Sequence, residues 1–129
     1  MSTDKTTVAR VALIGLGRVG GRFLEEMLPL KARGIAIVGA AELGDTPGKA
    51  RAQAAGIPVG TLEEIVDMGD QVDIIFDLSG SQGVRQALRQ RLQDSGNRHT
   101  TIAPEIMARL LWAVVSDEQL ADPHGAHGY

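Results

Sequence analysis

Three glycines near the N-terminus, Gly15, Gly17 and Gly20, have the spacing G-x-G-x-x-G. The apolar run 8–14 precedes them and an amphipathic segment follows, so strand, turn and helix are predicted in that order. In that context the first glycine permits a tight turn, the second lets backbone approach a diphosphate, and the third lets the helix pack closely on the strand. Amide groups and the dipole at the helix N-terminus attract phosphate. The spacing predicts a diphosphate site, and the alternative is a glycine-rich turn that meets no nucleotide.

A carboxylate follows the second predicted strand. Glu42 lies 22 residues beyond Gly20 (42 − 20). There it accepts hydrogen bonds from ribose hydroxyls and repels a 2′-phosphate, which favours NAD over NADP; the alternative is a solvated loop glutamate. Arg18, inside the loop, is either a partner for phosphate or a surface arginine. The predicted cofactor contacts are Gly15, Gly17, Arg18, Val19, Gly20, Glu42, Ser79, Gly80 and Ser81.

The segment Ser79–Ser81 ends the predicted strand 72–78 and faces the glycine turn. We expect it to line the ribose of the nicotinamide half, and either serine is also suited to cap the next helix. Asp77, within that strand, needs a partner if it is buried, and a structural role is favoured over a catalytic one. No residue is assigned a catalytic role.

No metal site is predicted. The chain has no cysteine, so disulfides, thiolate sites and cysteine nucleophiles are excluded. His99 opens a predicted strand, and His124 and His127 lie in the polar tail without other ligands beside them.

Composition restricts the class of protein. With 129 residues, 43% hydrophobic and 22% charged, one globular domain is expected. The net charge of −3 and dispersed arginines argue against nucleic-acid binding. No apolar run is long enough to span a membrane, and residues 1–7 lack a signal-peptide core, so a cytoplasmic protein is expected.

Short apolar runs alternate with helical segments. This alternation predicts an α/β fold of three layers, with right-handed crossovers and a parallel sheet of five strands in the order 3-2-1-4-5. The dinucleotide-binding domain is predicted to span 1–129, with 1–7 and 116–129 flexible. The strands are expected at 8–14, 35–40, 57–59, 72–78 and 99–103, and the helices at 18–30, 49–55, 61–68, 82–94 and 105–115.

Four stretches, Val11–Gly20, Ile35–Glu42, Gly60–Ile65 and Val72–Phe76, resemble the NAD(P)-binding Rossmann domain of the glucose-fructose oxidoreductase/inositol dehydrogenase family. The relatives of that family include homoserine dehydrogenase, aspartate dehydrogenase and dihydrodipicolinate reductase. The resemblance implies NAD binding. However, the family's lysine after the fifth strand is missing from Thr101–Glu105, and the substrate domain is not expected in this length.

Three functions remain open. The first is an NAD(H)-binding module that senses the nucleotide or acts as a regulatory subunit, like the nucleotide-sensing domains of potassium channels, whose glycine loops are similar. The second is an NAD-dependent oxidoreductase whose substrate site is completed by a dimer mate or partner chain. The third is a protein-interaction scaffold that has lost the ligand.

The last predicted helix, 105–115, is apolar almost all round. A surface helix with only one buried side has a polar face. We therefore expect one side to cover the sheet and the other, with Met107, Leu111 and Trp112, to form a homodimer contact. The alternative is a helix buried within its own chain.

Overall fold

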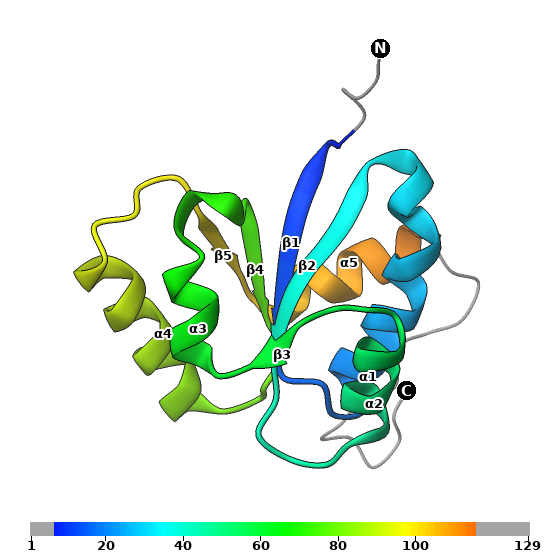
Figure 1. Ribbon diagram of the computed structural model, residues 1–129, viewed down its shortest axis with the longest axis horizontal. Coiled ribbons are helices and arrows are strands. Elements are labelled where there is room, and N and C mark those ends of the chain that lie inside the picture. The colour runs from blue at the N-terminus through cyan, green and yellow to red at the C-terminus, as the bar shows by residue number, and fades with distance from the viewer. Residues whose placement is uncertain (1–6, 116–129) are drawn as a thin grey trace.

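The computed structural model describes residues 7–115 of the chain. Most of the predicted flexible leader, residues 1–6, and the whole tail, 116–129 with His124 and His127, lie outside the described residues. Five parallel strands form one sheet in the order β3-β2-β1-β4-β5, as predicted (Figure 1). The strands are β1 (Ala9–Ile14), β2 (Ile35–Ala41), β3 (Val59–Gly60), β4 (Ile74–Asp77) and β5 (Thr101–Ala103).

An α-helix follows each strand along the chain. They are α1 (Arg18–Met27), α2 (Pro47–Ala54), α3 (Leu62–Asp67), α4 (Gln82–Asp94) and α5 (Glu105–Val115), with 3₁₀ turns η2 (Leu28–Arg33) and η3 (Gly69–Gln71). The predicted helix 18–30 is wrong in its last turn, because Pro29 lies in η2 and the chain tightens there. Gly34, in the left-handed region at φ 93°, ends this turn.

Hydroxyl caps begin three of the helices. Thr46 accepts a hydrogen bond from the Lys49 amide and begins α2, with Pro47 in the first turn. Thr61 and Glu64 form a capping box at the start of α3. Ser81 caps α4 by accepting from the Val84 amide. These caps fix where each helix leaves the carboxyl edge of the sheet.

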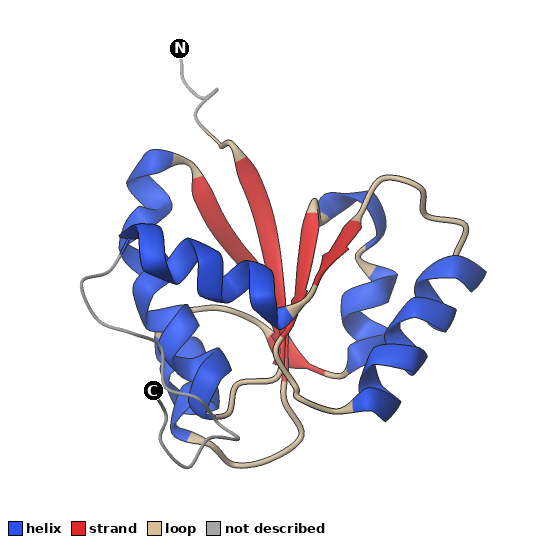
Figure 2. Ribbon diagram, turned by 180° about the vertical axis from the view of Figure 1, so that it is seen from behind, coloured by secondary structure: helices blue, strands red, loops and turns tan. Residues whose placement is uncertain are grey.

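Two helical layers cover the sheet. α1, α2 and α5 lie on one face and α3 and α4 on the other (Figures 1 and 2). Successive strand residues point to opposite faces, so each layer has its own core. Leu13 and Phe76 pack with Phe23 of α1 on the first face, whereas Ile75 packs with Leu88 of α4 on the second.

α5 buries the residue that was expected to be exposed. Trp112 is only 2% exposed and packs against Val19 of α1, with the Arg22 guanidinium 5.4 Å from its ring centroid. The prediction that Trp112 lies on the uncovered side is therefore wrong, because α5 lies against the first turns of α1. The uncovered side is formed by the other large apolar residues of the helix: Ile106, Met107, Leu110, Leu111, Val114 and Val115.

An ion-pair cluster joins three strands at the amino edge of the sheet, away from the glycine turn. The Asp73 carboxylate accepts from the Arg10 amide and side chain at 2.8–3.1 Å, and the His99 Nε2 lies 2.6 Å from its Oδ1. These partners, Arg10 foremost, hold the pKa of Asp73 well below its usual range. His99, which opens the fifth predicted strand, is thus an ion-pair partner just before β5.

We expect Asp73→Asn to lower the free energy of unfolding at pH 7 by about 1–3 kcal/mol, because charged hydrogen bonds are lost in a partly buried cluster. A carboxyl with a lowered pKa in the folded chain contributes its full stabilisation above the unfolded pKa of about 4 and loses it as pH falls further. Urea unfolding at pH 7 and pH 3 measures both effects.

The difference between wild type and Asp73→Asn should therefore shrink at pH 3. Asp67→Asn, on the exposed end of α3, is the matched control and should stay within about 0.5 kcal/mol of wild type. An Asp73→Asn variant with wild-type stability at both pH values would contradict the assignment.

Candidate functional site

The glycine turn between β1 and α1 is shaped by close backbone contacts. Gly15 has φ 96°, and a Cβ on it would lie 2.8 Å from the Ser79 Cα. A Cβ on Gly20 would overlap the carbonyl oxygen of Gly15. Both positions therefore require glycine, the first for its left-handed backbone and both for space. The turn and the end of β4 lie directly against each other.

Gly17 has a different role. A Cβ built on it meets no atom within 4 Å, so this position faces open space. Gly17 is also the N-cap of α1, and as a glycine it has no side chain to accept a hydrogen bond from the first turn of this helix. α2, α3 and α4, by contrast, carry hydroxyl caps. Within residues 7–115, therefore, no N-cap side chain satisfies the amide groups at the start of α1, and an external acceptor is suited to this position.

Glu42 holds the turn from the end of β2. Its Oε1 accepts from the Leu16 amide at 2.6 Å and its Oε2 from the Gly44 amide at 2.9 Å. Thr46 donates its hydroxyl to the Leu16 carbonyl at 2.8 Å. The Leu16 side chain is fully buried. Each carboxylate oxygen keeps a lone pair for a further donor, since an ionised carboxylate offers about four acceptor sites.

A cleft of about 340 Å³ lies at this carboxyl edge of the sheet. It brings together seven of the nine predicted contact residues, which come from three separate segments. These are Gly15, Gly17, Arg18, Val19, Glu42, Ser79 and Gly80. Gly20 lies beneath the turn instead, where it provides packing space. Ser81 does not line the cleft and caps α4.

Ser79 is held by Asp77 from below. The Asp77 Oδ1 accepts from the Ser79 amide at 3.1 Å and the Ser79 hydroxyl at 2.7 Å. The Ser79 oxygen in turn accepts from the Ser81 amide at 3.2 Å. Asp77 is buried, its Oδ2 has no hydrogen-bond partner among residues 7–115, and the Arg85 Nε lies 4.0 Å from that oxygen. Because its proton is directed to Asp77, the Ser79 hydroxyl presents an acceptor to the cleft.

A second hollow, of about 310 Å³, lies on the other side of Glu42. Its walls are mainly apolar and come from the ends of β1 and β2, the start of α3, and α4. They include Ile14, Leu43, Leu62 and Val84. Leu43 is 87% exposed although it directly follows Glu42. This hollow is suited to a flat apolar ring.

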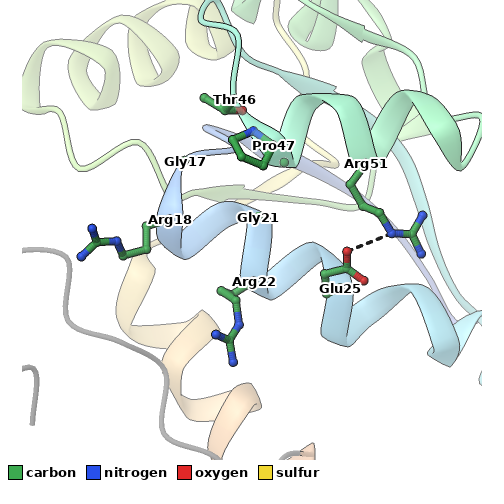
Figure 3. Close-up of a pocket in the computed structure, with 9 residues that line it drawn as sticks. Gly17, Arg18, Gly21, Arg22, Glu25, Thr46, Pro47 and Arg51 are labelled. Carbon is green, nitrogen blue, oxygen red and sulfur yellow. Dashed lines mark ion pairs between the residues drawn. The ribbon is translucent and has the colours of Figure 1, made fainter.

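A further hollow, of about 520 Å³, is a groove between α1 and α2 lined by Gly17, Gly21, Pro47 and Gly48 among others. Its arginines do not converge: Arg18, Arg22 and Arg51 point in different directions (Figure 3). Arg51 pairs with Glu25 at 2.9 Å, and Arg22 stacks over Trp112. The positive charges of these arginines are therefore not directed at one point in the groove where a ligand could bind.

Three residues of the site were not identified from the sequence. Thr46 caps α2 and also fixes the Leu16 carbonyl. Leu43 could have been identified from the sequence, because it is a large apolar residue directly after the carboxylate at the end of a strand. Glu105 lines the cleft beside Ser79 and Gly80, and nothing in its local sequence indicates this.

Among residues 7–115, no group of three or more acidic, histidine or cysteine side chains is arranged to hold a metal ion. No helix in this range is long and apolar enough to cross a membrane.

Two solved structures with a similar architecture are dehydrogenases. A homoserine dehydrogenase from Thiobacillus denitrificans matches with a TM-score of 0.53 and 30% identity over 74% of this chain. A myo-inositol 2-dehydrogenase from Lactobacillus plantarum matches with a TM-score of 0.50 and 16% identity over 79% of the chain. The chain resembles the N-terminal Rossmann-like domain of this dehydrogenase family. No protein-family model and no curated protein matches the sequence.

This Rossmann-like domain corresponds to part of each neighbour. It spans 23% of the homoserine dehydrogenase chain and 37% of the inositol dehydrogenase chain. The likeness therefore supports the dinucleotide-binding architecture, and the activities of those whole proteins are a separate question.

We expect Gly48→Ala to destabilise the domain by about 1–3 kcal/mol, as overpacking does in close-packed cores. The new Cβ would lie 2.5 Å from the Leu16 carbonyl oxygen and 3.0 Å from the Gly21 Cα, where α1 and α2 cross. Thermal unfolding followed by circular dichroism measures the loss.

Gly83→Ala is the matched control, because its Cβ would meet only the Ser81 hydroxyl, at 3.7 Å, in the first turn of α4. It should leave stability unchanged or raise it by up to about 1 kcal/mol through helix propensity. Equal melting temperatures for Gly48→Ala and wild type would show that the helix crossing tolerates a methyl group.

Proposed function

We propose that this domain binds NAD(H) and serves as a nucleotide-sensing or regulatory module. The observation that carries the proposal is the uncapped start of α1 behind the open position at Gly17. Backbone amides directed to an open cleft at a helix N-terminus favour a phosphate group. The diphosphate would lie there, with Arg18 on the same rim of the cleft.

We expect the site to bind NAD more tightly than NADP. Glu42 would accept hydrogen bonds from the hydroxyls of one ribose with the lone pairs that Leu16 and Gly44 leave free. A 2′-phosphate at that ribose would meet the carboxylate as a like charge. The adjoining apolar hollow at Leu43, Leu62 and Val84 would take the adenine ring.

The other half of the ligand would extend along the end of β4. Ser79 and Gly80 line the cleft there, and the Ser79 oxygen would accept from a ribose hydroxyl. The nicotinamide group, when bound, supplies the redox chemistry. The residues of this chain would bind and orient the ligand.

An NAD-dependent oxidoreductase is the alternative, favoured by the two dehydrogenase neighbours. In that case a second copy or a partner chain would complete the substrate site. An assay of NADH formation with a panel of hydroxy and amino acids distinguishes the two: turnover favours the oxidoreductase, and binding without turnover favours the sensing module.

Calorimetric titration tests the proposal directly. We expect NAD and NADH to bind in the micromolar range, about −8 kcal/mol, and NADP to bind more weakly. We expect Gly17→Val to abolish binding without unfolding the chain, because its side chain would occupy the space in front of the amides. Gly17→Ala should give an intermediate loss.

The melting temperature of each Gly17 variant serves as the folding control. If NAD binds Gly17→Val as tightly as wild type, the diphosphate does not lie at the start of α1. If no dinucleotide binds the wild-type chain, the scaffold hypothesis replaces this proposal.

We further propose that α5 forms a homodimer contact through its uncovered side, which includes Met107 and Leu111. This side carries apolar residues at helical spacing, from Ile106, 66% exposed, to Val114, 74% exposed. Apolar surface of this kind is typical of a protein–protein contact. Trp112, which is buried, is not part of the proposed contact.

Leu110→Glu, at the centre of this side and 56% exposed, should shift the chain from dimer to monomer in sedimentation experiments while its melting curve stays cooperative. The matched control is Arg89→Glu on exposed α4, which should leave the dimer intact. A wild-type chain that sediments as a monomer at every concentration would contradict the dimer.

A further inference from the structure

Glu105 follows β5 and Glu42 follows β2, so β1 and β4 lie between them in the sheet although both residues line the cleft. Glu105 is the first residue of α5 and lines the cleft together with Ser79 and Gly80. Its side chain is 20% exposed, which places the carboxylate between protein and solvent. Neither the sequence nor the dehydrogenase neighbours assign it a role.

The carboxylate is held in one orientation. Arg109, one helical turn later, donates its Nε and Nη2 to the same oxygen, Oε2, at 3.0 and 2.9 Å. Within residues 7–115, no donor reaches the other oxygen, Oε1. Arg109 is not among the residues that line the cleft, so the negative end of this ion pair is the end that a ligand meets.

The proposed binding mode determines which part of a ligand comes near Glu105. If one ribose lies at Glu42 and the diphosphate at the start of α1, the remaining half continues toward Ser79 and Glu105. In NAD that half ends in the nicotinamide ring, which carries a positive charge when oxidised and none when reduced. A carboxylate beside the ring therefore distinguishes the two states by charge.

We propose that Glu105 makes this site bind the oxidised dinucleotide more tightly than the reduced one, an inference that rests on the proposed NAD(H) function. The module would then respond to the redox state of the pool and not only to its size. Coulomb attraction at the edge of a protein, partly offset by Arg109, corresponds to a preference of roughly three- to tenfold.

Calorimetric titration of the full chain with NAD, NADH and ADP-ribose tests this inference. ADP-ribose lacks the nicotinamide ring but keeps every group on the Glu42 side, so it measures binding that does not involve the ring. We expect wild type to bind NAD roughly three- to tenfold more tightly than NADH. In Glu105→Gln the ratio should fall to about one, with the affinity for ADP-ribose unchanged.

Two further variants complete the design. Glu25→Gln removes another ion-paired carboxylate, one that lies in the groove between α1 and α2 and outside the cleft, and should leave the ratio as in wild type. Arg109→Gln removes the offsetting charge and should raise the ratio. Melting curves show whether each variant is folded, and the opposite signs at Glu105 and Arg109 separate charge from structural damage.

The outcomes separate this inference from the proposed function. If none of the three ligands binds, the proposed function fails. If ADP-ribose, NAD and NADH bind but the wild type shows no preference for NAD, or Glu105→Gln keeps the wild-type ratio, the proposed function stands and the role of Glu105 is refuted.

Discussion

The peptide groups of Leu16 hold the site together. The amide donates to Glu42, the carbonyl accepts from Thr46, and the side chain is buried between β1 and its covering helices. Three segments far apart in the sequence, the ends of β1 and β2 and the start of α2, are therefore joined at one residue. A glycine-rich turn has high conformational entropy, and this anchor fixes it in one conformation before any ligand arrives. The open face at Gly17 is useful only because its neighbour is fixed.

The carboxyl edge and the amino edge of the sheet are built from different chemistry. At the carboxyl edge, backbone amides, hydroxyls and the carboxylates of Glu42 and Glu105 surround open space. At the amino edge, Arg10, Asp73 and His99 satisfy one another. The paired charges at the amino edge contribute stability, whereas at the carboxyl edge Glu42 and Glu105 keep lone pairs beyond their bonds within the protein. The stabilising ion pairs and the groups available to a ligand thus lie at opposite ends of the strands.

Much of this arrangement could be predicted from local sequence. Glycine spacing, the apolar runs, and caps such as Thr61 with Glu64 act over a few residues, so strand order and helix starts were predictable. Contacts between distant segments were not. Gly48 must be glycine because of Leu16, and Glu105, which begins α5 just after β5, lines the same cleft as the distant glycine turn. The burial of Trp112 was not predicted, because a helix that is apolar on all sides has no polar face to indicate which side is exposed.

The packing of Trp112 against Val19 has a practical consequence. Trp112 is the single tryptophan of the chain, and Val19 also lines the cleft, in the uncapped first turn of α1. The indole is therefore one side chain away from the place where ligand phosphates would gather, and the Arg22 cation over its ring makes its emission sensitive to shifts of that turn. The protein therefore has an intrinsic fluorophore beside its cleft, and a ligand that binds there would be detectable by tryptophan fluorescence without a label.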